Sequence, residues 1–135
     1  MKWMFLAVLA LALGTVAPAW ADDDTSRVFE IRTYTTAPGK LEDLQRRFRE
    51  HTLKLFERHG MVNIAYWIPQ DPKAASNTLI YVLAHKSREA AAQSWAAFSA
   101  DPEWKQVRAA SEANGPIVIK VESTFAAATD FSPMK

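Results

Sequence analysis

Glu30, Arg32 and Tyr34 stand two positions apart in the stretch VFEIRTYTT, where apolar and polar residues alternate. Successive side chains of an extended strand point to opposite faces, so these three share one face. A carboxylate beside a guanidinium can act as an acid/base pair or anchor an anion. Glu30 and Arg32 are therefore candidate catalytic residues. The simpler alternative is a structural charge ladder with Lys120 and Glu122, which belong to a later strand-like segment.

The three histidines are the other residues suited to acid/base or ligand chemistry. His51 and His59 fall on one predicted helix, and a rise of ~1.5 Å per residue places them about 12 Å apart, too far to share a metal ion. No His-x-x-x-His or carboxylate–histidine spacing indicates a metal, so no metal site is predicted. His51 is a candidate catalytic or pocket residue, with an exposed surface histidine as the alternative. His59 is expected to cap its helix or join the core, and His85 to end a strand.

Aromatic side chains are abundant, and such side chains either line small-molecule pockets or fill a core. Trp95 lies on the inner side of a predicted helix and is the best pocket candidate. The predicted ligand-binding residues are Tyr34, His51, Tyr66, Trp67, Trp95 and Phe98.

Composition excludes several classes of protein. The chain has no cysteine, which excludes thiolate zinc sites, disulfides and a cysteine nucleophile. It also lacks a Gly-x-Ser-x-Gly motif, a phosphate loop and a dinucleotide fingerprint. Without Lys2, the basic residues equal the 15 acidic ones, so no charge excess indicates a nucleic-acid partner or an anionic membrane surface.

The N-terminal stretch has the three parts of a secretory signal peptide: a basic start, the apolar run WMFLAVLALALGTV and small residues before a cleavage site. Residues 1–21 are predicted to be removed. The alternative is an uncleaved anchor, but the run is short for a span of ~20 residues and is interrupted by Gly14 and Pro18. The mature protein is then exported, periplasmic or secreted, without a stable membrane anchor. Residues 22–27 are expected to be a flexible N-terminus, 28–125 the domain and 126–135 a tail.

The chain between these ends reads as alternating strands and helices. The predicted elements are strand 28–36, helix 41–59, strands 61–68 and 77–86, helical residues 88–113 that restart at Asp101, and strand 117–125. Their order, β-α-β-β-α-β, predicts an α+β, ferredoxin-like fold with the first strand inside a four-stranded antiparallel sheet. On the first helix, the solvated side is predicted to carry Glu42, Asp43, Arg46, Arg47, Glu50, Lys54, Glu57 and Arg58.

The alternation in the first strand also predicts which face meets the helices. The apolar set Phe29, Ile31 and Thr33 is expected to pack against them, and the face with Glu30 and Arg32 to point away. The middle strands are apolar on both sides, which favours burial of the second face as well. We therefore predict a homodimer in which two sheets pack face to face.

Several segments together resemble the NIPSNAP family: FEIRTYTTAPGKL, ERHG, IAYWIP, NTLIYVLAHKSREAAAQSW and DPEW. The resemblance covers about residues 28–122. It implies a dimeric α+β barrel of ferredoxin-like topology. Relatives of that fold include small monooxygenases, isomerases and haem-degrading enzymes with a pocket between helices and sheet, so the resemblance implies no single mechanism.

Three functional hypotheses follow. The first is a homodimer that binds a small apolar or aromatic molecule in a helix–sheet pocket, with cofactor-free monooxygenase or isomerase chemistry. The second is a non-catalytic interaction or scaffold module. The third is haem binding through one histidine; otherwise no cofactor is predicted. The sequence does not decide between an enzyme and a binding protein.

Overall fold

The computed structural model describes residues 27–135. The predicted signal peptide (1–21) lies outside the described residues, as does the segment after it except Arg27. Among residues 27–135, no helix is long and apolar enough to cross a membrane. The elements are β1 (Val28–Thr36), α1 (Leu41–Arg47), the π-helix η2 (Phe48–Thr52), α2 (Leu53–Arg58), β2 (Val62–Trp67), α3 (Pro72–Ala75), β3 (Thr78–His85), α4 (Arg88–Ala100), α5 (Pro102–Ser111) and β4 (Val118–Ala127).

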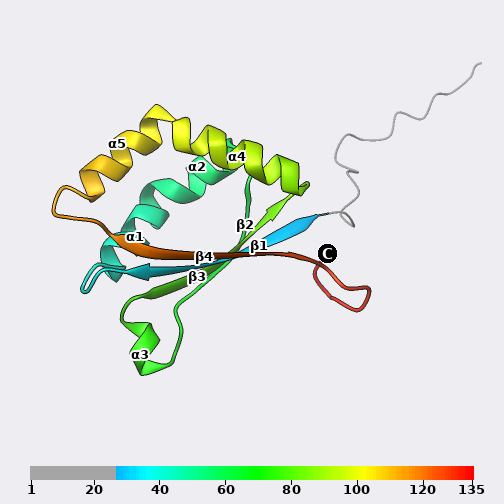
Figure 1. Cartoon of the computed structure of the whole chain (residues 1–135), viewed down its shortest axis with the longest axis horizontal. Helices are drawn as coiled ribbons and strands as arrows, with labels where there is room; N and C mark the ends of the chain where they lie inside the picture. The colour runs from blue at the N-terminus through cyan, green and yellow to red at the C-terminus, as the bar shows by residue number, and fades with distance from the viewer. Residues whose placement is uncertain (1–26) are drawn as a thin grey trace, which may run out of the picture.

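The strands form one four-stranded sheet in the order β2-β3-β1-β4, and each neighbouring pair is antiparallel. The predicted α+β, ferredoxin-like order with a central first strand is confirmed. Helices α1, α2, α4 and α5 lie on the same side of the sheet (Figure 1). Only the short helix α3, which lies in the connection between β2 and β3, extends to the other side (Figure 1).

The two long helical segments begin and end where the sequence indicates, with one exception inside the first. Ser87 and Asp101 cap α4 and α5, accepting hydrogen bonds from the backbone N–H groups of Ala90 and Glu103. The predicted helix 41–59 is interrupted by η2, which the periodicity did not indicate. Such a π turn adds a residue to the helical repeat and rotates the side chains that follow.

The prediction for the two faces of β1 was wrong. Glu30 is 1% exposed and accepts a hydrogen bond from the indole of Trp95 on α4, so its face meets the helices. Ile31 is 40% exposed and lies on the uncovered face. Polarity misled the prediction because a carboxylate can be buried when enough donors surround it.

The predicted ladder of Glu30 and Arg32 with Lys120 and Glu122 is also wrong. The β1–β4 register pairs Thr33 with Glu122 and Thr35 with Lys120, which places these charges on the opposite face from Glu30. Lys120 and Glu122 instead form an exposed ion pair with each other at 3.1 Å.

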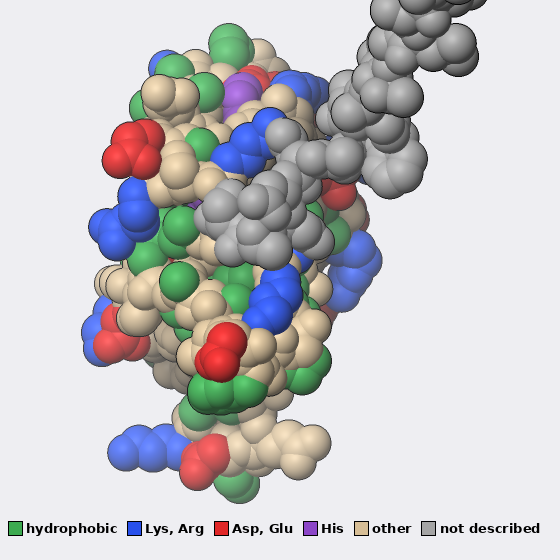
Figure 2. Space-filling view, turned by 90° about the vertical axis from the view of Figure 1, so that its right-hand side faces the viewer, with side chains coloured by type: hydrophobic (Ala, Val, Ile, Leu, Met, Phe, Trp, Pro, Cys, Tyr) green, Lys and Arg blue, Asp and Glu red, His purple; other side chains and the backbone are tan. Residues whose placement is uncertain are grey.

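The uncovered face of the sheet, here called the outer face, has an apolar centre. Register places Ile31 beside Val82 and Val82 beside Ala65, while Ile80 lies between Thr33 and Trp67. The tail borders this face, because Ser132 and Met134 line a hollow together with Phe29 and Ile31. On the side of the molecule shown in Figure 2, acidic and basic side chains are interspersed rather than gathered by sign.

The core fills the layer between helices and sheet. Tyr81 at the centre of β3 is fully buried and contacts the rings of Tyr34, Phe48, Phe56 and Tyr66. The same cluster includes Leu44, Leu55, Met61, Leu83 and Ile117, which are at most 1% exposed, and Leu79 and Phe98, which are 4% exposed.

Gly60 ends α2 with a positive φ of 79°, and its N–H donates to the carbonyl of Glu57. A Cβ there would lie 3.7 Å from the Ser94 hydroxyl, an ordinary contact, so the strain of a substitution comes from the backbone. We expect Gly60→Ala to lower the free energy of unfolding by about 1 kcal/mol in urea titrations. Gly60→Asn should cost less, because asparagine tolerates the left-handed region. Equal stability of the alanine variant and the native protein would contradict this reading.

Candidate functional site

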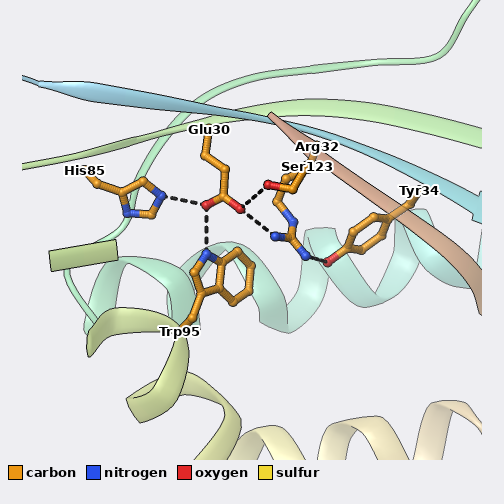
Figure 3. A network of polar contacts seen from close by, with 6 residues as sticks. All are labelled: Glu30, Arg32, Tyr34, His85, Trp95 and Ser123. Carbon is orange, nitrogen blue, oxygen red and sulfur yellow. Dashed lines mark hydrogen bonds and ion pairs between the residues drawn. The ribbon is translucent and has the colours of Figure 1, made fainter. Parts of the chain in front are cut away.

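A buried carboxylate organises the helix-facing side of the sheet (Figure 3). Glu30 Oε2 lies 2.8 Å from both His85 Nε2 and Trp95 Nε1. Glu30 Oε1 accepts from Arg32 Nη1 at 2.5 Å and from Ser123 Oγ at 2.8 Å. Burial alone would raise the pKa of Glu30, but these hydrogen bonds outweigh it and lower the pKa to about 2. The group is therefore a carboxylate, and His85 Nε2 carries the proton that it accepts.

Arg32 connects this carboxylate to an aromatic surface. Its guanidinium lies 4.2 Å from the centre of the Trp95 ring and donates to Tyr34 Oη at 3.3 Å (Figure 3). Hydrogen bonding to Glu30 and stacking on Trp95 hold the guanidinium in one place, as expected for a cation over an indole face.

A cavity of about 290 Å³ lies next to these side chains, between the sheet and the helices. That volume is just below the ~300–1,000 Å³ range of ligand cavities. The lining combines aromatic rings with arginines. Its residues are Arg32, Tyr34, Arg47, Phe48, Thr52, Phe56, Trp95, Phe98, Ser99, Trp104, Arg108, Glu112, Val118 and Val121.

The π-helix contributes directly to the cavity wall. Phe48 and Thr52 line the cavity from its two ends, and Arg47 precedes it. The Thr52 hydroxyl donates to the backbone carbonyl of Arg47 at 3.2 Å, which satisfies both groups in a buried place. Because π turns occur often at functional sites, this local irregularity supports the assignment of the cavity as the site.

A second polar group lies on the helical side of the cavity. Arg47 Nη1 donates to Ser111 Oγ at 3.1 Å and to Glu112 Oε1 at 3.3 Å. Arg108 Nε donates to the other oxygen of Glu112 at 3.3 Å. Trp104 packs between these groups and the core, with its ring 4.5 Å from that of Phe98. The sequence prediction placed Arg47 on the solvated face, but the residue is 6% exposed.

The cavity brings together some of the predicted site residues and excludes others. Tyr34, Trp95 and Phe98 line it beside Arg32, and Glu30 lies directly behind Arg32.

His51 lines a separate groove of about 540 Å³ between α1 and α5, where its side chain is 43% exposed. Tyr66 and Trp67 line another hollow beside β2, and Trp67 is 54% exposed. His51, Tyr66 and Trp67 therefore do not belong to one site with Trp95.

Sequence reasoning missed Thr52 and Glu112 entirely. It treated Arg47 as a surface charge and did not include Trp104 among the site residues. Trp104 packs α5 onto α4, and it lines the cavity as well.

The other two histidines have structural partners. His59 Nε2 lies 2.7 Å from Asp101 Oδ2 at the junction of α4 and α5, and His85 is bound to Glu30. The cavity lining contains no histidine, so its residues do not fit a histidine-ligated haem. Within residues 27–135, no three acidic or histidine side chains gather as metal ligands would.

Comparison with known proteins agrees with the fold. The sequence profile of the NIPSNAP family matches residues 29–133. A solved NIPSNAP family protein of unknown function from Agrobacterium tumefaciens has 19% identity and a TM-score of 0.70, with 82% of this chain and 96% of that chain covered. A NIPSNAP-like domain protein from Burkholderia xenovorans has 17% identity and a TM-score of 0.69, covering 81% and 90%.

A more distant structure is SnoaB, a cofactor-independent oxygenase from Streptomyces nogalater. It has 14% identity and a TM-score of 0.54, with 80% of this chain and 98% of that chain covered. No curated protein matches the chain. At these identities the structural likeness shows the fold alone. The profile match, however, spans most of the sequence, and the chain belongs to the NIPSNAP family.

Proposed function

We propose that this chain is an exported, homodimeric protein that binds a small aromatic molecule in the helix–sheet cavity and supports its cofactor-independent oxygenation. The observation that carries the proposal is Arg32, a fixed cation on the wall of an aromatic cavity. An aromatic ring can lie against Trp95 or Tyr34 while an oxygen substituent meets the guanidinium. The fold shared with SnoaB, a cofactor-independent oxygenase, supports this class of chemistry.

The geometry assigns different roles to the polar groups. Glu30 is a poor base, because its pKa is about 2 and its oxygens already accept four hydrogen bonds. It acts instead as the counter-ion that positions Arg32. Of the described residues that line the cavity, Glu112 alone is a carboxylate, so it is the candidate proton acceptor.

The chemistry requires a substrate that forms an electron-rich anion. Loss of a proton from a ring CH₂ that is conjugated with a carbonyl, directly or through an aromatic ring, gives an enolate-type anion, whose oxygen Arg32 can stabilise. That anion reacts with O₂, and overall the CH₂ and O₂ become C=O and water. Every electron that reduces O₂ then comes from the substrate.

The outer face supports the homodimer. Its apolar centre around Ile31 and Val82 is left uncovered by the helices, and Ile31 and Trp67 are 40% and 54% exposed. A second copy would bury this face against the same face of its partner. Export rests on the signal-peptide pattern of residues 1–21 and places the protein in the periplasm or outside the cell.

Native mass spectrometry of the exported protein, purified without added ligand, tests the binding proposal. A dimer carrying a small-molecule increment supports it, and the mass identifies the ligand class. Anthrone, whose ring CH₂ lies beside aromatic rings and opposite a carbonyl, then tests the reaction by O₂ uptake above the rate without protein. A ligand-free dimer that neither binds anthrone nor takes up O₂ with it would favour a scaffold module.

Blocking the cavity mouth should abolish binding. Val121 on β4 lines the cavity and is 48% exposed, so Val121→Trp adds bulk there without disturbing the core. Val62 on β2 has the same 48% exposure and lies outside the cavity, which makes Val62→Trp the matched control. We expect at least a roughly tenfold weaker affinity for anthrone in calorimetry for the first variant alone. Equal affinities in both variants would place binding elsewhere.

A charge in the centre of the outer face should prevent dimerisation. Ile31→Lys buries an unpaired ammonium in the proposed interface, so we expect a monomer by light scattering where the native protein is a dimer. Ile119→Lys is the control, because Ile119 is exposed next to Lys120 on β4 rather than in the apolar centre. A dimer that survives Ile31→Lys would rule out pairing through this face.

Glu30 should stabilise the fold in a pH-dependent way. Its pKa falls from 4.5 to about 2 on folding, so its contribution is complete above about pH 4.5 and is lost as the pH falls towards 2. The shift corresponds to on the order of 3 kcal/mol. We expect Glu30→Gln to lower stability at neutral pH by that order and to flatten the acid dependence of urea unfolding. Glu122→Gln, at an exposed site, should do neither.

A further inference from the structure

Arg47 is a buried cation with spare hydrogen-bonding capacity. It is 6% exposed and lies at the end of α1, immediately before the π-helix. Both of the hydrogen bonds that its side chain makes to described residues leave from Nη1, towards Ser111 and Glu112. Its Nε is buried without a hydrogen-bond partner. A buried donor without an acceptor is costly, so the site favours an acceptor from outside the described chain.

The charges around the cavity do not balance. Arg32 is paired with Glu30, but Arg47 and Arg108 share the single carboxylate of Glu112. Three guanidinium groups on the lining therefore share two carboxylates, which leaves an excess of one positive charge, and of the two arginines at Glu112 it is Arg47 that is buried, because Arg108 is 62% exposed. Burial lowers the pKa of Arg47, and the contacts with Glu112 only partly oppose this effect.

Arg32 also has a buried N–H group that lacks a hydrogen-bond acceptor, at Nε. Arg32 comes from the sheet and Arg47 from the helical layer, and both line one cavity. An anionic oxygen group is the acceptor that suits a guanidinium, and a carboxylate can accept two parallel N–H groups from one edge of it.

The position of Arg47 also suits a ligand with one charged end. Arg47 lines both the cavity and the polar groove between α1 and α5, whose lining includes charges of both signs from Lys40, Asp43, Arg46 and Glu50. Trp104 lines the cavity but not the groove, and its ring centre lies 5.2 Å from the guanidinium carbon of Arg47. A ring can thus lie among aromatic side chains while its charged substituent stays at Arg47.

We propose that the cavity selects aromatic ligands carrying an anionic oxygen substituent, a carboxylate or an ionised phenol, and that Arg47 is the residue that binds this substituent. This inference rests on the proposed function, since it assumes that the cavity binds an aromatic ring. It adds the charge of the ligand and the residue that determines the selectivity.

The test compares ligands that differ in charge but hardly in shape. Calorimetry of the full mature protein with 2-naphthoate and with 2-naphthamide measures the preference for a carboxylate. A nitro-naphthol that is ionised at neutral pH measures the preference for a phenolate, against neutral 2-naphthol. We expect at least one anion to bind about 10- to 100-fold more tightly than its neutral counterpart, the usual effect of a charge-assisted hydrogen bond.

The variants then assign that preference to Arg47. Arg47→Met should remove it while leaving 2-naphthamide affinity within about twofold, because the ring contacts remain. Arg47→Lys keeps the positive charge but lacks the planar guanidinium with its parallel N–H groups, so it should retain part of the preference for the anionic ligand. Arg49→Met is the matched control, because Arg49 is 65% exposed and lies outside the cavity. Thermal unfolding of each variant confirms that it is folded.

The outcomes separate this inference from the proposed function. Native protein that binds neutral and anionic ligands equally overturns the inference and leaves the proposed function standing. A preference that survives Arg47→Met in folded protein, or a variant that loses both ligand types equally, overturns the role of Arg47. If no naphthalene ligand binds at all, the result contradicts the proposed function, on which the inference rests. The anion that shows the Arg47-dependent preference identifies the substituent.

Discussion

Burial of the Glu30 carboxylate is the constraint on which the site depends. A charged group at 1% exposure is tolerable only if every oxygen lone pair that water would have filled is taken by a donor. The donors come from β1, β3, β4 and α4, namely Arg32, His85, Ser123 and Trp95. One carboxylate therefore joins three neighbouring strands to the helix that packs on them. Displacement of any of these elements would remove a hydrogen-bond donor from the buried Glu30 carboxylate.

The same contacts position the groups that face the cavity. Trp95 uses its N–H for Glu30 and its ring face for Arg32, so its orientation is fixed from two directions. Arg32 in turn reaches Tyr34, whose ring packs at right angles to that of Tyr81 in the core. The cavity wall is thus an extension of the core and is held by core contacts. Such a wall is arranged before any ligand arrives, which lowers the entropic cost of binding.

The order of elements was predictable because it depends on local patterns. Alternation, caps and glycine stops are signals carried by residues close together in the sequence, such as the caps Ser87 and Asp101 and the positive-φ Gly60. The orientation of β1 was not predictable in this way. Alternation shows that Glu30 and Ile31 face opposite sides, but which side is buried depends on His85, Trp95 and Ser123, which are distant in sequence.

The site was predicted in part for the same reason. Trp95 and Phe98 lie on the inner side of their helix and line the cavity as predicted. Tyr34 lines it too, although its face of β1 was expected to point away from the helices. His51 was misplaced and Arg47 was read as exposed. In a segment of charged residues, a regular helical repeat cannot reveal the additional residue of the π turn at Phe48–Thr52. Nor does the sequence disclose that Glu112, far along the chain, provides a partner for Arg47.

The arrangement of β4 has a consequence for solubility. This strand hydrogen-bonds to β1 along one side only, and within residues 27–135 no strand occupies its other side. Unpaired backbone groups along ten residues, beside the exposed Ile119 and Val121, would invite strands of other molecules to add on. Lys120 and Glu122 interrupt this apolar stretch with opposite charges, which an incoming strand would have to desolvate. The pair that forms no part of the cavity thus acts as a gatekeeper against aggregation.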